Sequence, residues 1–307
     1  MMRKVTLISI LLLGCLLKAF PQQNPLYSQF MTNPFLINPA LAGTYPYYQI
    51  MLNSRVQWVG FTDAPMTNVI SMYGPTVKKP MGLGGYIMYD VYGATSITLI
   101  KLSYAYNYAI SENLKISMGL ALGLKQFKIS GNMTIADPGD KTYQPGYTFT
   151  KLYPDASWGA YLYSSTYHIG LAITNLFGNK VEYGIDTVTN LSKLKQNFYL
   201  HGGYKYNVSR ELSIEPTVVF KKITATPVQM DLDVRAWYGK RQWDRTKLWG
   251  GVSYRTGDAI SILLGIIYQR KIEFGYSYDI GINKLRGYNS GSHEIMIGFK
   301  FNDIKEY

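Results

Sequence analysis

The chain has 307 residues, which is enough for one large β domain or two smaller domains, and no linker-like stretch divides it. It holds 28 Tyr and 29 Gly but only 16% charged residues, whereas soluble proteins usually have about a quarter. This composition favours strands over helices. The net charge of +12 suits anionic lipid headgroups, polysaccharide or acidic partners. No zinc-finger spacing, helix-turn-helix pattern or RNP-like motif favours a nucleic-acid partner.

Residues 1–21 have the pattern of a secretory signal peptide. A basic start is followed by an apolar run over 5–17, which is short for a membrane-spanning helix, and the chain turns polar at Lys18. We expect cleavage within residues 19–22. The single cysteine, Cys15, lies inside this segment, so the mature chain would carry no disulfide, cysteine nucleophile or thiolate metal site. Lipidation of Cys15 is an alternative, but the apolar run continues past it.

Residues 22–46 form an irregular N-terminal segment rather than a strand. Asn33-Pro34 and Asn38-Pro39 both favour turns within it. If a barrel follows, such a segment is expected either to plug the lumen or to lie across the periplasmic mouth. In both cases its first role would be structural.

From residue 47 to residue 302 the chain alternates between apolar and polar residues. In KIEFGYSYDIGIN, which starts at Lys271, one alternate set is apolar or aromatic and the other is charged, polar or small. This period of two predicts antiparallel strands with one apolar face and one polar face. The predicted strands are 47–60, 67–75, 81–92, 94–108, 112–130, 155–165, 166–176, 194–208, 210–222, 228–239, 246–256, 259–270, 271–283 and 291–302.

The lengths of these strands indicate a membrane barrel. Many are near ten residues or longer, whereas soluble strands usually have about five to six, and a bilayer requires about 9–11 tilted residues. We therefore predict an all-β fold, an antiparallel transmembrane β-barrel of about 14 strands over 47–302, followed by a tail at 303–307. The apolar face would meet lipid with interfacial tyrosines, and the polar face would line the lumen. A secreted soluble β-sandwich is the alternative.

Connection lengths form a second pattern. The predicted connections 131–154 and 177–193 are long and 284–290 is moderate, while several of those between them nearly vanish. Long and short connections alternate in outer-membrane barrels because one end faces outward and the other faces the periplasm. The connections at 239–245 and 255–258 break this alternation. The long loops suit contact with cargo, and a basic periplasmic turn at Lys240–Trp243 suits contact with a larger machine.

Few residues point to chemistry. His168, His201 and His293 fall on different predicted strands without metal-ligand spacing, and Gly82–Gly85 lacks the full dinucleotide-binding pattern and favours small-residue packing in the lumen. Within Asp231–Arg235, the two aspartates are expected to form lumen ion pairs with Arg235 or a neighbour. No serine elbow, zinc-protease motif or phosphate-binding loop is present. The sequence predicts no catalytic residue, cofactor or metal site.

The N-terminal segment and the start of the first predicted strand share a specific pattern, an Asn-Pro block followed by Arg-x-Gln-Trp. Its residues are Asn33, Pro34, Asn38, Pro39, Gly43, Arg55, Gln57 and Trp58. With this pattern the chain closely resembles one protein family, the PorP/SprF membrane proteins of the type IX secretion system of Bacteroidetes. Strand motifs such as GLGGYIMYDVYGATS and SGSHEIMIGFKF also match, so the resemblance covers essentially the whole mature chain.

The resemblance implies an outer-membrane barrel without catalytic residues that serves type IX secretion. Some relatives are core parts of the machine, beside periplasmic ring proteins and peptidoglycan-linked lipoproteins. Others are dedicated to one large surface adhesin, which they help to export or anchor, as in gliding motility. An outer-membrane diffusion channel or small-molecule transporter is the alternative function, because the lumen face is charged and rich in glycine.

Overall fold

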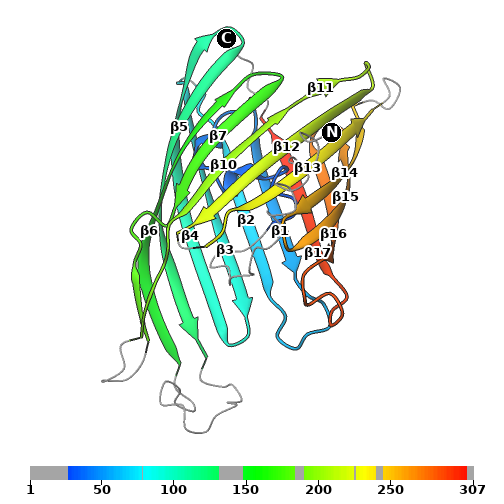
Figure 1. Cartoon of the computed structure of the whole chain (residues 1–307). Helices are drawn as coiled ribbons and strands as arrows, with labels where there is room; N and C mark the ends of the chain where they lie inside the picture. Colours follow the sequence, from blue (N-terminus) through cyan, green and yellow to red (C-terminus); the bar gives the residue numbers. More distant parts are fainter. Residues whose placement is uncertain are drawn as a thin grey trace, which may run out of the picture.

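The computed structural model describes residues 27–77, 79–130, 148–183, 190–224, 226–239 and 245–302, and within them the chain forms a closed antiparallel β-barrel (Figure 1). The fourteen barrel strands are β1 (Tyr48–Val56), β2 (Met66–Pro75), β3 (Met81–Tyr92), β4 (Thr95–Ser111), β5 (Leu114–Ile129), β6 (Phe149–Tyr163), β7 (Tyr167–Thr174), β10 (Asn197–Tyr204), β12 (Leu212–Ile223), β13 (Gln229–Tyr238), β14 (Lys247–Arg255), β15 (Ala259–Tyr268), β16 (Ile272–Gly281) and β17 (Ser292–Phe301). The predicted barrel of about 14 strands is confirmed.

The barrel is a meander in which each strand pairs with its neighbour along the chain. Closure comes from β1, which pairs with β17 from Tyr48–Phe301 to Val56–His293. The long connection between β7 and β10 does not interrupt the wall, because β10 pairs with β7 on one side and with β12 on the other. A two-residue strand, β11 (Tyr206–Asn207), extends the sheet beside β12. The barrel therefore has no open seam among its fourteen strands.

The two faces of each strand differ as the alternation predicts. In β16, Phe274 and Ile280 are exposed on the outside, whereas Glu273 and Asp279 are buried inside. Leu102, near the middle of β4, is 72% exposed to the outside. Large apolar side chains on the outside and buried charges on the inside are the reverse of a soluble domain and match a barrel surrounded by lipid.

The strands differ most from the predicted ones in three places. Strand β6 begins at Phe149 because its pairing with β5 continues through Pro154, a residue that usually ends a strand. The predicted strand 194–208 is interrupted at Lys205, between β10 and β11. A separate hairpin of β8 (Lys180–Tyr183) and β9 (Asn190–Lys193) forms within the expected loop.

The connections divide the barrel into two ends. The end at the bottom of Figure 1 carries the connections 57–65 and 282–291 and the described parts of 130–148 and 175–196. We call it the long-connection end, and the opposite end the short-connection end. The two connections that break the predicted alternation do so in the structure as well. The connection 239–246, at the short-connection end, is longer than 256–258, at the long-connection end. The basic turn at 240–243 and most of the loop predicted at 131–154 lie outside the described residues.

Residues 27–47, here called the plug segment, lie inside the barrel (Figure 1). Both Asn-Pro pairs open short 3-10 turns, η1 (Pro34–Leu36) and η2 (Pro39–Leu41), which confirms the predicted turns. The plug segment begins near the long-connection end, where Ser28 contacts β16 and β17, and runs to the start of β1 at the short-connection end. Two placements were predicted, plugging the lumen or lying across the periplasmic mouth, and the structure has the segment in the lumen.

Among the described residues, no helix is both long and apolar enough to cross a membrane. The expected signal peptide at 1–21, including Cys15, and the tail at 303–307 lie outside the described residues.

Candidate functional site

Arg55 is the centre of a buried charge network where the plug segment meets the wall. Its guanidinium lies 2.6 Å from Asp279 Oδ2 and 3.3 Å from Glu294 Oε2, and it donates to Ser28 Oγ at 2.9 Å. Ser28 in turn donates its hydroxyl to Asp279 at 2.7 Å and its backbone N–H to Glu294 at 2.7 Å. Arg55, Asp279 and Glu294 are 2%, 2% and 0% exposed. Because buried charges need partners, these contacts tie the plug segment to β1, β16 and β17.

A second buried guanidinium, that of Arg255, extends this network. It lies 3.3 Å from Asp231 and 3.2 Å from Asp258, and it donates to the backbone oxygen of Tyr27 at 3.2 Å. On the plug segment itself, burial raises the pKa of the Tyr27 hydroxyl well above its usual value. That hydroxyl therefore stays protonated and donates to Met88 Sδ at 3.3 Å. The start of the plug segment is thus held on two sides of the lumen.

Asn33 holds the next turn of the plug segment against the wall. It caps the start of η1 by position rather than by a side-chain hydrogen bond. Its side-chain amide instead donates to Asn53 Oδ1 at 3.0 Å and to Ser71 Oγ at 2.9 Å. Both acceptors are buried polar side chains on the lumen face of β1 and β2.

Asn38 serves both its own turn and the opposite wall. Its side-chain oxygen accepts the Ala40 N–H at 2.9 Å, which caps η2. Its side-chain nitrogen donates to the backbone oxygens of Ala160 and Leu171 at 3.2 and 3.3 Å and lies 3.1 Å from His201 Nε2. One side chain therefore reaches β6, β7 and β10 while fixing the local turn.

The two prolines set the direction of the plug segment. Pro34 and Pro39 each stand at the first position of a turn, where a missing N–H costs nothing. The turns bury Phe35 and Leu41, which are 1% and 0% exposed. Phe35 stacks on Tyr73 of β2 with ring centroids 4.3 Å apart. Apolar packing thus fills the space between the polar anchors.

Glycines on the lumen face make room for the plug backbone. A Cβ on Gly119 of β5 would lie 2.6 Å from the Ala40 nitrogen, and one on Gly159 of β6 would lie 2.0 Å from Asn38 Oδ1. Gly43 has φ +75, a conformation that favours glycine, and a Cβ added to it would lie 2.7 Å from Gly82 Cα. The predicted small-residue packing at Gly82–Gly85 is confirmed for Gly82, which contacts Ala42 and Gly43.

Within the described residues, no hydrogen bond or ion pair links Gln57 or Trp58 to the plug segment. They line a small pocket at the long-connection end with Asp258, Asn289 and Ser292. Trp58 has φ +49 and donates its backbone N–H to Ser292 Oγ at 3.1 Å. The structure thus separates the motif into plug anchors and a pair of rim residues.

Sequence reasoning missed the partners of these motif residues. Glu294 and Ser28 were assigned no role, and for Asp279 the alternation gave only its place on the lumen face and not Arg55 as its partner. His168 and His201 come together, with ring centroids 6.3 Å apart, because β7 and β10 are neighbours. That pairing was hidden by the connection of more than twenty residues between the two strands.

Of the ion pairs expected for the two aspartates of the Asp231–Arg235 stretch, the described residues show the one at Asp231, and it is formed with another strand. Asp231 pairs with Arg255 of β14, and Arg235 lies 4.0 Å from Glu215 of β12. The Arg235 guanidinium also stands over the Trp237 ring, 4.3 Å from its centroid. Across the described ranges, no group of three or more His, Cys, Asp or Glu residues is placed to hold a metal ion.

Comparison with protein families identifies the chain. The model of the type IX secretion system membrane protein PorP/SprF matches residues 19–299. The chain belongs to the PorP/SprF family. It is therefore a membrane component of type IX secretion, and the barrel fold with its apolar outer face places it in the outer membrane. The family and the fold are those of a membrane secretion barrel and not of a known enzyme.

Solved structures share this PorP/SprF protein's fold at low identity. The CymD monoaromatic hydrocarbon channel has a TM-score of 0.51 and 11% identity, with 90% of this chain and 92% of that chain covered. The toluene transporter TbuX of Ralstonia pickettii has a TM-score of 0.52 and 10% identity, with 87% and 92% covered. The toluene transporter TodX of Pseudomonas putida has a TM-score of 0.51 and 8% identity, with 87% and 93% covered. A search of curated proteins finds no significant match.

Replacing Arg55 with methionine should strongly destabilise the barrel. Arg55→Met leaves the carboxylates of Asp279 and Glu294 buried without their shared cation, and breaking a buried pair in this way costs about 3–5 kcal/mol. The measurement is urea unfolding of the purified protein in detergent micelles. The matched control is Arg286→Met, an exposed arginine in the connection 282–291, which should change the free energy of unfolding by about 0.5 kcal/mol or less. Equal effects of the two variants would contradict the network.

Adding one methyl group at Gly119 should displace the plug segment. Gly119→Ala places a Cβ against the backbone of Ala40, which cannot move without shifting η2. The readout is maleimide labelling of a Leu41→Cys reporter, a site that is 0% exposed in the native chain.

Labelling of the Leu41→Cys reporter should be slow in the parent and clearly faster in the Gly119→Ala background. Gly250→Ala is the control, because a Cβ there meets Leu264 at an ordinary 3.4 Å. Unchanged labelling in Gly119→Ala, in a barrel that still shows heat-modifiable gel mobility, would show that the plug segment does not depend on this contact.

Proposed function

We propose that this PorP/SprF protein is a closed, non-enzymatic outer-membrane barrel that supports the export or surface anchoring of type IX cargo. The observation that carries the proposal is the plug segment, which family-motif residues fasten to the lumen wall at both Asn-Pro turns and, through Ser28, at Arg55. A motif that fastens a plug, rather than lining an open path, favours a scaffold or anchor over a conduit.

The interior packing supports a closed lumen. One buried apolar cluster combines Phe35, Ala40 and Leu41 of the plug segment with Met51, Trp249 and other residues of the wall. The charged lumen face, which motivates the channel alternative, is largely engaged in ion pairs such as Arg55–Asp279. Charges that are paired in this way are poorly placed to contact a solute moving through the lumen.

The two ends of the barrel offer different surfaces for partners. At the long-connection end, Phe61 and Tyr288 are exposed, and Tyr288 is 75% exposed, which suits contact with cargo or a large surface adhesin. At the short-connection end, exposed basic residues stand on several turns. They are Lys79, Arg210, Arg245, Arg270 and Lys271. This charge suits acidic faces of the periplasmic ring or of peptidoglycan-linked lipoproteins.

The test is a surface and secretome inventory of a clean deletion strain, complemented with the wild-type gene as control. Loss of many unrelated type IX cargo proteins is expected if the protein is a core component. Loss of one large adhesin, with other cargo unaffected, is expected if it is a dedicated anchor. Normal export and display of every type IX cargo protein in the deletion strain would overturn the proposal.

A further inference from the structure

The anchor at Asn38 includes one acceptor that a proton can remove. The side-chain nitrogen of Asn38 lies 3.1 Å from His201 Nε2 and donates to the backbone oxygens of Ala160 and Leu171 at 3.2 and 3.3 Å. Its side-chain oxygen accepts the Ala40 N–H at 2.9 Å. Two backbone oxygens can only accept and a backbone N–H can only donate, so these partners fix which end of the amide faces His201.

The contact therefore sets the protonation of the His201 ring. An amide nitrogen donates and does not accept, so Nε2 must offer a lone pair. A neutral imidazole with its proton on Nδ1 offers one, whereas an imidazolium carries a proton on both ring nitrogens. A proton on Nε2 would meet the N–H groups of Asn38, which cannot turn away. The seated turn thus disfavours protonated His201 relative to a turn that has left this contact.

The wall holds the His201 ring in this position. The ring is buried, and it stacks on Tyr161 of β6 with ring centroids 5.7 Å apart and an interplanar angle of 21°. Gly170 of β7 leaves the room for it, because a Cβ there would overlap His201 Nε2 and lie 2.9 Å from Asn38 Nδ2. The ring cannot swing away from Asn38 without losing the stack on Tyr161.

The charged neighbours do not offer His201 a counterion. His168, the nearest titratable ring on β7, lies 6.3 Å away between centroids and pairs with Glu215 at 3.7 Å. Glu215 is also 4.0 Å from Arg235. Within the described ranges, no carboxylate lies at ion-pair distance from His201. The titratable groups that face this region are His168 of β7, Tyr161 and Tyr163 of β6, Glu215 of β12, Arg235 of β13 and Tyr45 of the plug segment.

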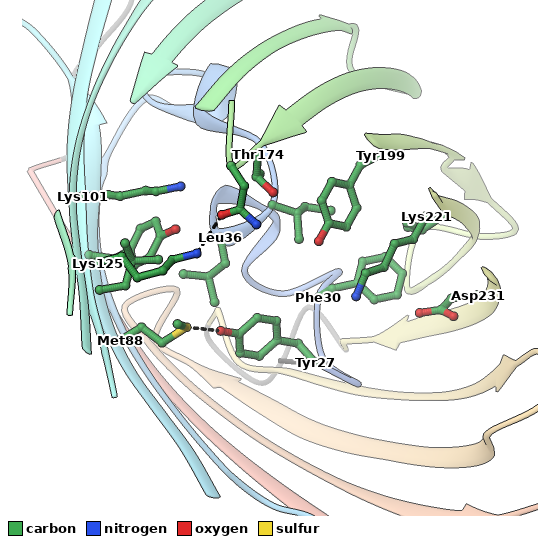
Figure 2. A pocket seen from close by; sticks show the side chains of 15 residues that line it. Tyr27, Phe30, Leu36, Met88, Lys101, Lys125, Thr174, Tyr199, Lys221 and Asp231 are labelled. Atoms are coloured by element: carbon green, nitrogen blue, oxygen red, sulfur yellow. Dashed lines mark hydrogen bonds between the residues drawn. The ribbon is translucent and has the colours of Figure 1, made fainter. Parts of the chain in front are cut away.

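A cavity beside the turn gives it room to move (Figure 2). Its volume is about 70 Å³, and its lining includes Leu36 and Ile37, the two residues directly before Asn38. Figure 2 shows Leu36 among the side chains that surround this space. Empty space on one side leaves these residues without packing partners there, so a shift of the turn costs less packing once its anchor is lost.

We propose that Asn38 and His201 form a pH-sensitive anchor that holds η2 of the plug segment near neutral pH and releases it in acid. Protonation of His201 removes the acceptor, and the equilibrium moves toward the unseated turn because that state binds the proton better. The anchor is complete above about pH 6.5, the ordinary pKa of histidine, and weakens as the pH falls below it. The contacts between Ser28 and Arg55 do not involve His201, so they keep the start of the plug segment in place.

The first test follows maleimide labelling of the Leu41→Cys reporter, which lies in η2, from pH 8 to pH 5 in the purified full-length protein. Labelling is compared with that of the same reporter in His201→Gln, whose side-chain oxygen can accept from Asn38 but does not titrate. Dividing the two rates at each pH cancels the pH dependence of the thiol and of every other titrating group. The ratio should be constant above about pH 6.5 and rise by up to about tenfold per pH unit below it. A ratio that stays constant down to pH 5 would overturn the proposal.

Two further variants place the effect on His201. His201→Leu has no acceptor, so its reporter should label fast already at pH 8. His293→Gln is the matched control, because His293 contacts the Tyr276 hydroxyl at 2.7 Å rather than the plug segment, and it should keep the full rise in acid. Heat-modifiable gel mobility confirms that each variant is folded. Slow labelling of folded His201→Leu at pH 8, or loss of the rise in His293→Gln, would also overturn the proposal.

Discussion

The ion pairs of Arg55 with Asp279 and Glu294 are the constraint on which the rest of the structure depends. Arg55 stands on the first strand, and its two carboxylates stand on the last two strands, so one side chain spans the seam where the barrel closes. The same side chain holds Ser28 of the plug segment. Closure of the wall and placement of the plug are therefore linked through one buried charge, whose loss would leave both without their shared partner.

The plug segment fits because the wall has glycines, which carry no side chain, at the points where the plug segment passes closest. Gly82, Gly119 and Gly159 stand on three strands at the points where Ala42, Ala40 and Asn38 approach. A larger side chain at any of these points would meet plug backbone or the Asn38 side chain. The polar anchors at Asn33 and Asn38 then satisfy hydrogen-bonding groups that the lumen leaves buried. Small residues and amides together turn a mostly irregular segment into a fixed part of the barrel.

Much of the fold could be predicted from the sequence. Alternation with a period of two shows directly which residues face lipid and which face the lumen. In KIEFGYSYDIGIN, this rule placed Glu273 and Asp279 inside and Phe274 and Ile280 outside, as the structure has them. The Asn-Pro turns were also predictable, because proline at the first position of a turn acts locally.

The partners across the lumen could not be predicted in the same way. Asn38 meets His201 across 163 residues of sequence, and Arg55 meets Glu294 across 239. Alternation gives the face of a residue but not its height or the strand opposite, which depend on the stagger of the whole barrel. The rim position of Trp58 was missed for a different reason. It depends on the ladder ending at Val56, where the alternation gave no stop signal.

The central claim is that the seated plug segment closes the lumen, and single-channel recording in planar bilayers tests it most directly. The purified protein is reconstituted at known density, and its insertion is verified by heat-modifiable gel mobility after recovery. The closed barrel predicts no stable conductance steps, since apolar packing around Leu41 and the ion pairs of Arg55 fill the path. Steady open-channel currents from the intact wild-type protein would contradict the account and favour a diffusion channel.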